Sequence, residues 1–161
     1  MARGQTDLVL VGAVGALIIG VAMYEFGSHG RPRLSTGRAS WTLTPGVVNP
    51  DVTPSTIHET ICRRGWTDTI RPPSSYTEEL VLRQMREYRR QGSRSDYQED
   101  HLISLELGGN PTDPRNLWPE PRPRAERVDA IENELNAAIC SGRMSLDDAQ
   151  RRISEIKHTE G

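Results

Sequence analysis

The segment from Tyr97 to Pro121, YQEDHLISLELGGNPTDPRNLWPEP, constrains the fold more than any other part of the chain. It begins with an acid–imidazole pair at Asp100-His101 and continues in an apolar run with the character of a strand. A glycine pair at Gly108-Gly109 then predicts a turn, and Asn116 opens a second short apolar run. The pattern predicts a hairpin that brings a carboxylate, an imidazole and an amide together, groups that can activate water beside a metal ion.

Length and charge favour one small domain without a global affinity for polyanions. The chain has 161 residues, of which 35% are hydrophobic, which fits a single domain and a tail. A formal net charge of −2 gives no overall field that would attract nucleic acid. Lys157 is the only lysine among 20 basic residues. This bias towards arginine is compatible with phosphate contacts, or simply with a solvated surface.

An uninterrupted apolar run, Leu8–Tyr24, predicts a transmembrane anchor within residues 1–26. Its length lies at the lower end of what spans a bilayer, and it is long for a core helix without a polar face. The alternative is an uncleaved secretory signal, since no clear cleavage site follows the run. Gly12, Ala16 and Gly20 recur every fourth residue, a stripe through which two such helices could form a homodimer.

Two features disagree about the side of the membrane on which the domain lies. Three arginines follow the run, and the positive-inside rule then places the domain in the cytoplasm; they are Arg31, Arg33 and Arg38. Cys62 and Cys140 indicate the opposite, because two cysteines behind an apolar leader usually form a disulfide in an oxidising compartment. Their spacing also excludes a paired-cysteine zinc site. We favour a disulfide and an extracytoplasmic domain, periplasmic or at the cell surface, over two separate buried thiols in the cytoplasm.

The region after the anchor divides into a linker and a folded domain. Residues 27–52 are rich in Gly, Pro, Ser, Thr and Arg without an apolar period, which predicts a flexible linker. The domain is expected over residues 53–161. A capping box at Ser75 predicts a helix that runs to about Arg90. Two further helices are expected on either side of Gly142, each with one apolar stripe.

Several motifs together resemble the HNH, or ββα-metal, endonuclease family. From about Asn49 to Ile153 the chain is similar to small, predicted secreted bacterial proteins with an HNH-like core. The shared features are Thr60-Ile61-Cys62, Trp66-Thr67, Arg71-Pro72-Pro73, D-H-L-I-x-L-E-L-G-G, N-L-W-P-E-P, Asp129 to Glu132, Cys140 to Gly142 and Ala149-Gln150. The resemblance implies an α+β, mainly helical fold, in which a ββα-metal hairpin–helix core is flanked by helices. It also implies a nuclease that uses a divalent ion, Mg, Mn or Zn, to hydrolyse nucleic acid, with DNA favoured over RNA as the substrate.

The resemblance assigns roles to the three motif residues. It implies that His101 is the general base and that the preceding Asp100 is a metal ligand. Adjacent strand residues point to opposite faces, so these two side chains can share a site only if the strand bends or twists. Asn116 corresponds to the family's middle asparagine, which holds the loop and the base in position.

The family's third signature, a histidine of the following helix, is absent. No histidine lies between His101 and His158, and Asn136 stands where the helix histidine is expected. Asp129 is the first choice as a substitute metal ligand, Glu132 is the second, and Asn136 is weaker. The alternative function is a catalytically inactive envelope or interaction module that keeps the fold.

Six arginines near these motifs are candidates for contacts with the nucleic-acid backbone. They are Arg83, Arg86, Arg90, Arg122, Arg124 and Arg127. The alternative is that they form a solvated face.

Overall fold

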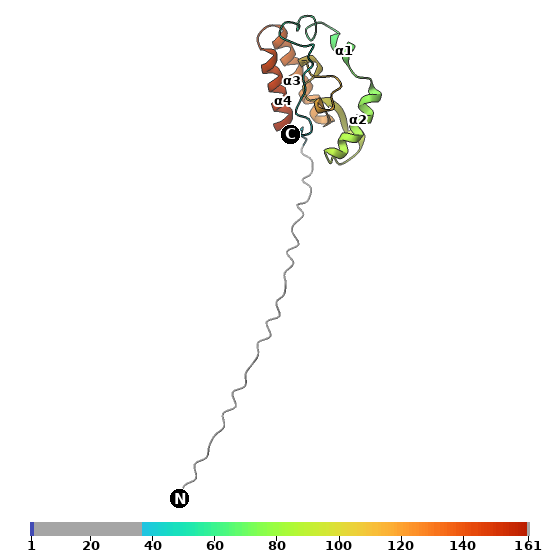
Figure 1. Cartoon of the computed structure of the whole chain (residues 1–161), viewed down its shortest axis with the longest axis vertical. Helices are drawn as coiled ribbons and strands as arrows, with labels where there is room; N and C mark the ends of the chain where they lie inside the picture. The colour runs from blue at the N-terminus through green and yellow to red at the C-terminus, as the bar shows by residue number, and fades with distance from the viewer. Residues whose placement is uncertain (2–36, 161) are drawn as a thin grey trace. The chain divides into compact units, whose positions relative to one another are not determined.

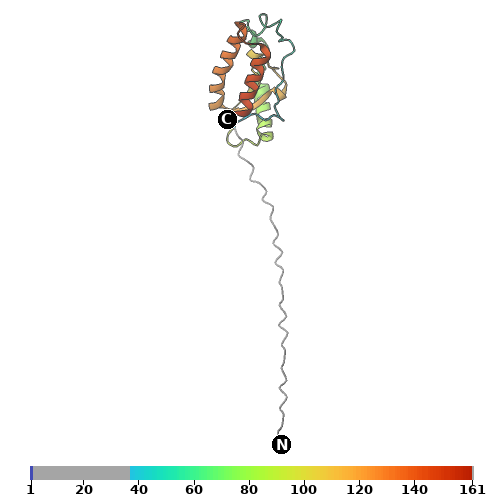
Figure 2. The same cartoon turned by 90° about the vertical axis from the view of Figure 1, so that its left-hand side faces the viewer.

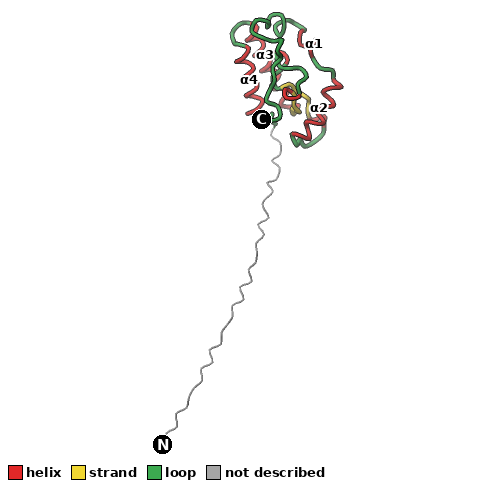
Figure 3. Tube along the Cα trace, in the orientation of Figure 1, coloured by secondary structure: helices red, strands yellow, loops and turns green. Residues whose placement is uncertain are grey.

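The computed structural model describes residues 37–160, together with Met1. Within this part the fold is α+β, as predicted, with four α-helices and one antiparallel pair of strands (Figures 1 and 3). In chain order the elements are α1 (Trp66–Ile70), α2 (Ser74–Glu87), β1 (Tyr97–His101), β2 (Leu117–Pro121), α3 (Arg122–Cys140) and α4 (Leu146–Thr159). Both strands contact α2 as well as α3.

The two strands pair through a long connection and not through a tight turn. Asp100 lies opposite Trp118 and His101 lies opposite Leu117. The apolar run that follows His101 was expected to continue the strand, and this is wrong. It leaves the sheet and forms a short 3₁₀ helix, Leu105–Leu107, whose leucines are buried. The burial of both leucine side chains against the helices favours this bend over a longer ladder.

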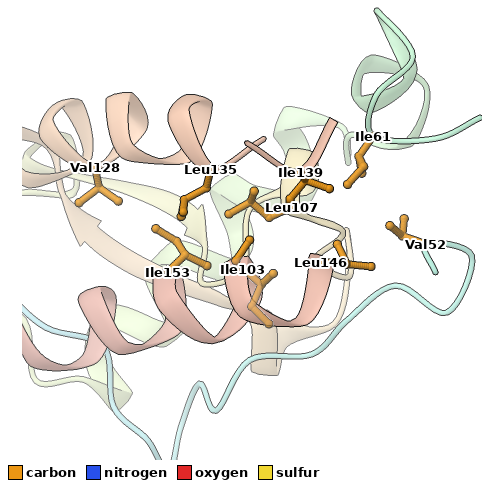
Figure 4. Close-up of a cluster of buried hydrophobic side chains, with 10 residues drawn as sticks. Val52, Ile61, Ile103, Leu107, Val128, Leu135, Ile139, Leu146 and Ile153 are labelled. Carbon is orange, nitrogen blue, oxygen red and sulfur yellow. The ribbon is translucent and has the colours of Figure 1, made fainter. Parts of the chain in front are cut away.

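The main apolar core lies between α3, α4 and the loop that connects the strands. The helices lie side by side (Figure 2), and their predicted apolar stripes are confirmed. Figure 4 shows the side chains from these elements and from the segment before α1 meeting in one cluster. Its buried members are Val52, Ile61, Ile103, Leu107, Val128, Leu135, Ile139, Leu146, Ala149 and Ile153.

Residues 37–52 are part of the folded domain. The expectation of a flexible linker over residues 27–52 is therefore wrong for residues 37–52, the portion that the structure describes. The Ala39 N–H donates to the Lys157 carbonyl at 2.9 Å, and the Asn49 N–H donates to the Gly108 carbonyl at 2.8 Å. Thr44 is fully buried, and its hydroxyl donates to the carbonyl of Leu117. A composition rich in polar residues suggested disorder, but these polar groups find partners in the loop and in α4. The domain therefore begins well before residue 53.

Only some of the helix caps are those that the sequence predicts. Helix α4 is capped as predicted, because the Ser145 hydroxyl accepts from the Asp148 N–H at 3.1 Å. Helix α2 begins at Ser74 directly after Pro73, and no side chain caps it. The expected capping box at Ser75 is therefore wrong, since the proline already sets the extended backbone that precedes the first turn.

Cys62 and Cys140 form a disulfide, as predicted. Their Cα atoms are 5.5 Å apart, and the bond joins residues separated by 78 positions. It connects the segment before α1 to the last residue of α3. The bond therefore closes a loop that contains both strands.

Replacing both cysteines with serine is expected to lower the free energy of unfolding by about 2–4 kcal/mol. The open chain regains conformational freedom when unfolded, since the closed loop of 78 positions is released. Urea unfolding monitored by circular dichroism measures the loss. Wild-type protein unfolded in a reducing agent is the matched control and should show the same decrease. Equal stability of oxidised and reduced protein would contradict this account.

None of the helices within residues 37–160 has the length and apolar character needed to cross a membrane. The predicted anchor over residues 1–26 and its small-residue stripe lie outside the described residues.

Candidate active site

A cavity of about 350 Å³ opens beside the end of β1. It is lined by residues from β1, from the following loop, from α3, from α1 and from Arg71, which follows α1. Four of the predicted site residues line it, namely Asp100, His101, Asp129 and Glu132. Asp100 and His101 are adjacent in β1, yet both border this space because the strand ends at His101. Residues from three separate elements thus meet at one cavity.

The ring of His101 is held in one orientation and one tautomer. The residue is 6% exposed, and its Nε2 lies 3.0 Å from the carbonyl oxygen of Pro111. A carbonyl can only accept, so Nε2 carries the proton and the neutral ring keeps its lone pair on Nδ1. Within the described residues no group forms a hydrogen bond with Nδ1. Burial lowers the pKa of His101, so the ring is neutral at pH 7 and able to accept a proton.

Asn116 fixes the loop on which the orientation of His101 depends. It is fully buried and does not line the cavity. Its Oδ1 accepts from the N–H of Ile103 at 3.0 Å, and its Nδ2 donates to the carbonyls of Ile103 and Asn110 at 3.0 and 2.9 Å. Asn110 precedes Pro111, so the amide holds the backbone that accepts from His101. This placement agrees with a positioning role and not with a reacting one.

Gly109 is required by the same loop. A Cβ at this position would lie 1.7 Å from the Ile103 carbonyl oxygen and 2.7 Å from Nδ2 of Asn116. Any side chain would therefore displace the backbone that Asn116 binds.

Lys157 occupies the centre of a buried charge cluster that sequence reasoning missed. Its Nζ lies 2.7 Å from Asp100 Oδ2, 2.7 Å from Glu132 Oε1 and 3.5 Å from Glu120 Oε2. It also donates to the carbonyl of His101 at 2.7 Å. Lys157 and Glu120 are fully buried. The available signal was a single lysine beside Ile153 and Ile156 on the inner face of α4.

The cluster sets the charge of the cavity wall. Burial opposes the ionisation of Asp100, but the ammonium of Lys157 outweighs it and holds the pKa of Asp100 well below its usual range. Burial raises the pKa of Glu120 to about 8 and that of Glu132 to about 7. Glu120 also forms a buried ion pair with Arg124. Of the three carboxyl groups around Lys157, Asp100 is therefore the one whose ionised form is most strongly favoured.

The fit of a divalent ion rests on Asp100 and Asp129. Glu132 Oε1 contacts Lys157, so the structure commits this second-choice ligand to the ammonium. Asp129 is exposed at the cavity, and 19% of the Asp100 side chain remains accessible. In residues 37–160, no three His, Cys, Asp or Glu side chains converge closely enough to hold a metal ion. Mg²⁺ commonly uses one or two carboxylates together with waters and substrate phosphates. Asp129 and the accessible part of Asp100 are the groups that would offer such ligands, although Asp100 Oδ2 also lies 2.7 Å from Lys157.

Asn136, the weakest candidate ligand, serves the fold. Its Nδ2 donates to the carbonyl of Glu106 at 2.7 Å and to that of Ile61 at 3.3 Å. It therefore ties α3 to the loop and to the segment that carries Cys62, and it does not line the cavity.

Two of the six predicted nucleic-acid arginines are buried, which corrects their assignment. Arg124 is 5% exposed, is paired with Glu120 and donates to the carbonyls of Ile156 and Glu160. Arg90 is 7% exposed and donates to the Arg38 carbonyl. Each guanidinium lies 5.4 Å from the centre of the Trp118 ring. Their packing against this buried ring explains why they are not on the surface.

The other four predicted arginines are exposed; they are Arg83, Arg86, Arg122 and Arg127. Arg86 borders a separate cavity of about 340 Å³ with three further arginines, Arg89, Arg90 and Arg94. Arg122 Nε donates to the Ser95 carbonyl, and Arg127 donates to the Pro123 carbonyl. None of the four lines the cavity of His101.

The site thus combines a neutral imidazole with a free lone pair, an ionised aspartate and a second, accessible aspartate. The pKa of Asp129 is raised by burial and by the charge of Asp100, as expected for two carboxyl groups facing one space. Such a set can deprotonate water and hold a cation beside it. Comparison of the chain with protein-family models, with curated proteins and with solved structures finds no match.

Proposed function

We propose that this domain is a metal-dependent endonuclease of the HNH type that hydrolyses phosphodiester bonds of nucleic acid. The observation that carries the proposal is the environment of His101. Its Nε2–H is bound to the Pro111 carbonyl, and its ring borders a cavity that Asp100 and Asp129 also line. A base held in this way is typical of enzymes that activate water near neutral pH.

The order of elements supports the same assignment. Asp100 and His101 end β1, Asn116 directly precedes β2, and α3 follows β2 without a break. Asp129 lies in the first half of α3 and reaches the cavity. This order of strand, loop, strand and helix, with these residue types, supports the arrangement that the family resemblance implies.

In the proposed reaction, Nδ1 of His101 takes a proton from water as the water oxygen forms a bond to phosphorus. The bond from phosphorus to the leaving sugar oxygen breaks, and that oxygen takes a proton from solvent. The Pro111 carbonyl stabilises the imidazolium that forms, because it accepts from Nε2–H throughout. Asp100 and Asp129 would hold a divalent ion, which supplies positive charge to the phosphate and to the leaving oxygen when bound. Lys157 keeps Asp100 ionised and fixed in place.

A supercoiled-plasmid nicking assay on the full chain, in Mg²⁺, Mn²⁺ or Zn²⁺, tests the proposal. Single-stranded DNA and RNA are assayed in parallel, and a chelator and the His101→Ala variant serve as controls. Cleavage that needs both the metal and His101 supports the assignment. If a folded protein cleaves none of the three substrates with any of the metals, the nuclease proposal fails.

A second candidate is a non-catalytic module that retains the fold. The observation in its favour is that the Lys157 ammonium bridges Asp100 and Glu132, so an internal cation already neutralises these carboxylates. Such a module would bind no divalent ion at this cavity. Thermal unfolding that is unchanged by millimolar Mg²⁺, Mn²⁺ or Zn²⁺, together with the absence of cleavage, would favour this alternative.

The proposal includes an extracytoplasmic domain tethered to a membrane through the N-terminal run. The Cys62–Cys140 disulfide supports it, because such bonds persist in oxidising compartments. Alkylation of the unreduced protein taken directly from cells, followed by mass spectrometry, tests the compartment. Two alkylated thiols would remove this argument.

The pH dependence of cleavage should report the pKa of His101. Burial of the ring lowers that pKa below the ordinary value of 6.5. Since only the neutral ring accepts a proton, kcat/KM should rise with pH and reach half its maximum below pH 6.5. Measuring kcat/KM over a series of pH values at saturating metal tests this rise. A midpoint above 6.5 would contradict the assignment of His101 as the base.

A further inference from the structure

A second cavity adjoins the first across the end of β1. It has a volume of about 340 Å³ and is lined by the start of α2 and by β1. The two cavities share four lining residues, Arg71, Gln98, Asp100 and His101. The candidate base therefore lies where one space passes into the other, and Arg71 lies at the same junction.

The backbone of Arg71 is fixed by its neighbours. Its N–H donates to the Thr67 carbonyl at 3.0 Å and ends α1. Pro72 and Pro73 follow, and a residue before proline is held in extended conformation; here φ is −60° and ψ is 128°. The arginine is thus presented at the cavities by a constrained segment.

The side chain of Arg71 is available for a ligand. Among the described residues that line the two cavities, Arg71 is the only arginine or lysine. It is exposed, and no ion pair or side-chain hydrogen bond ties its guanidinium to another residue in the described part of the chain. Arg124 and Lys157, by contrast, are buried in ion pairs.

The ionised carboxylates at the junction would repel a phosphate unless a cation faced it. Asp100 and Asp129 line the first cavity together with Glu106 and Glu132, whereas burial raises the pKa of Glu99, which lines the second cavity, to about 9 and favours its neutral form. A guanidinium binds phosphate through two parallel N–H donors, which a point charge cannot match. The position and chemistry of Arg71 therefore suit a phosphodiester passing between the cavities.

We propose that Arg71 binds a phosphate of the substrate strand at the junction of the two cavities, and that the second cavity receives the adjoining nucleotide. This inference rests on the proposed nuclease function and deepens it, because it names the residue and the groove that hold the substrate. His101 lines both cavities, so a phosphate bound at their junction lies beside the candidate base and is exposed to attack.

Binding of a fluorescent 12-nucleotide single strand, measured by anisotropy in Ca²⁺ on the His101→Ala background, tests this role without cleavage. Adding Arg71→Ala should weaken binding by about 10- to 100-fold, the loss expected for hydrogen bonds to a charged group. It should also reduce the slope of log K against log salt concentration by about one, as expected for the loss of one phosphate contact. The affinity of Arg71→Lys should lie between those of the background protein and Arg71→Ala. Lysine keeps the positive charge but lacks the parallel N–H donors of the guanidinium.

Arg64→Ala is the matched control, because Arg64 is exposed and lines neither cavity. Its affinity should stay within about 2-fold of the background protein. Urea unfolding should show the same stability for both variants. If Arg71→Ala binds as tightly as Arg64→Ala, or if the background protein binds no strand, the phosphate site is wrong.

The experiments distinguish an error in the proposed phosphate site from an error in the proposed nuclease function. Metal-dependent cleavage that is unchanged by Arg71→Ala would leave the nuclease standing and overturn the site. Arg71-dependent binding by a protein that cleaves nothing would keep the site and overturn the nuclease.

Discussion

Replacing His101 with alanine is expected to reduce metal-dependent phosphodiester cleavage by about 10²- to 10⁴-fold, the usual contribution of a positioned general base. The ring is neutral because burial lowers its pKa, and Nδ1 is free because Nε2–H is bound to the Pro111 carbonyl. Removing the ring takes away the proton acceptor and leaves the carboxylates in place. Single-turnover cleavage at saturating metal measures the effect on the chemical step.

Three controls separate loss of the base from loss of the fold or of the metal. His101→Ala removes one hydrogen bond, which costs about 0.5–1.5 kcal/mol, so urea unfolding should still show a folded protein. Added imidazole should restore part of the rate, because the space left by the ring opens onto the cavity. Asp129→Asn should instead raise the metal concentration needed for half-maximal rate. Cleavage by His101→Ala within about 10-fold of wild type would contradict the role of His101 as base.

The parts of the fold that sequence predicted are those set by local periodicity. Residues at helical spacing in α3 and α4 form the buried stripes, since one face of each helix must leave water. The closeness of Asp100 and His101 to the segment after Asn116 also followed from local order, because Asp100 pairs with Trp118 and His101 pairs with Leu117, although Asn116 itself lies outside the cavity. The disulfide followed from its context, two cysteines behind an apolar leader.

The errors concern contacts between residues far apart in the chain. Residues 37–52 resemble a linker in composition, but their order depends on partners such as the carbonyls of Gly108 and Leu117. Arginine is usually exposed, and no local pattern distinguished buried Arg124 from exposed Arg127. Lys157 meets Asp100 across 57 positions, a pairing that neither periodicity nor a motif could reveal.

Lys157→Met is expected to lower the free energy of unfolding by about 3–5 kcal/mol, the usual loss when one partner of a buried ion pair is removed. Methionine fills a similar volume, so the loss reports charge and not a cavity. Asp100, Glu120 and Glu132 would then share a buried space without the ammonium that lies within 2.7–3.5 Å of each. Urea unfolding at pH 7 measures the difference from wild type.

The pH dependence gives the sign of this effect. In the wild type the pKa of Asp100 is lowered, so its contribution is present above the ordinary carboxyl pKa of 3.8 and is lost as the pH falls. In the variant the carboxyl pKa values rise, so the folded state binds more protons than the unfolded chain and gains stability as the pH falls towards about 4.5. The difference in stability between the two proteins should therefore narrow from pH 7 to pH 4.5. A constant difference over this range would show that packing, and not charge, accounts for the loss.

A matched double variant measures the coupling between Lys157 and Glu132. Adding Glu132→Gln to Lys157→Met removes, at almost constant volume, a carboxyl group whose ionisation the buried site opposes once the ammonium is gone, and it should recover part of the stability. The same substitution in the presence of Lys157 should destabilise, since the ammonium then loses a partner that lies 2.7 Å away. If Lys157→Met exposes a true cation site, Mg²⁺ or Mn²⁺ should raise the unfolding temperature of the single variant more than that of the wild type or the double variant. If Glu132→Gln changes the free energy of unfolding with opposite signs in the two backgrounds, Lys157 and Glu132 are directly coupled. Substitutions at independent sites would have additive effects on that free energy.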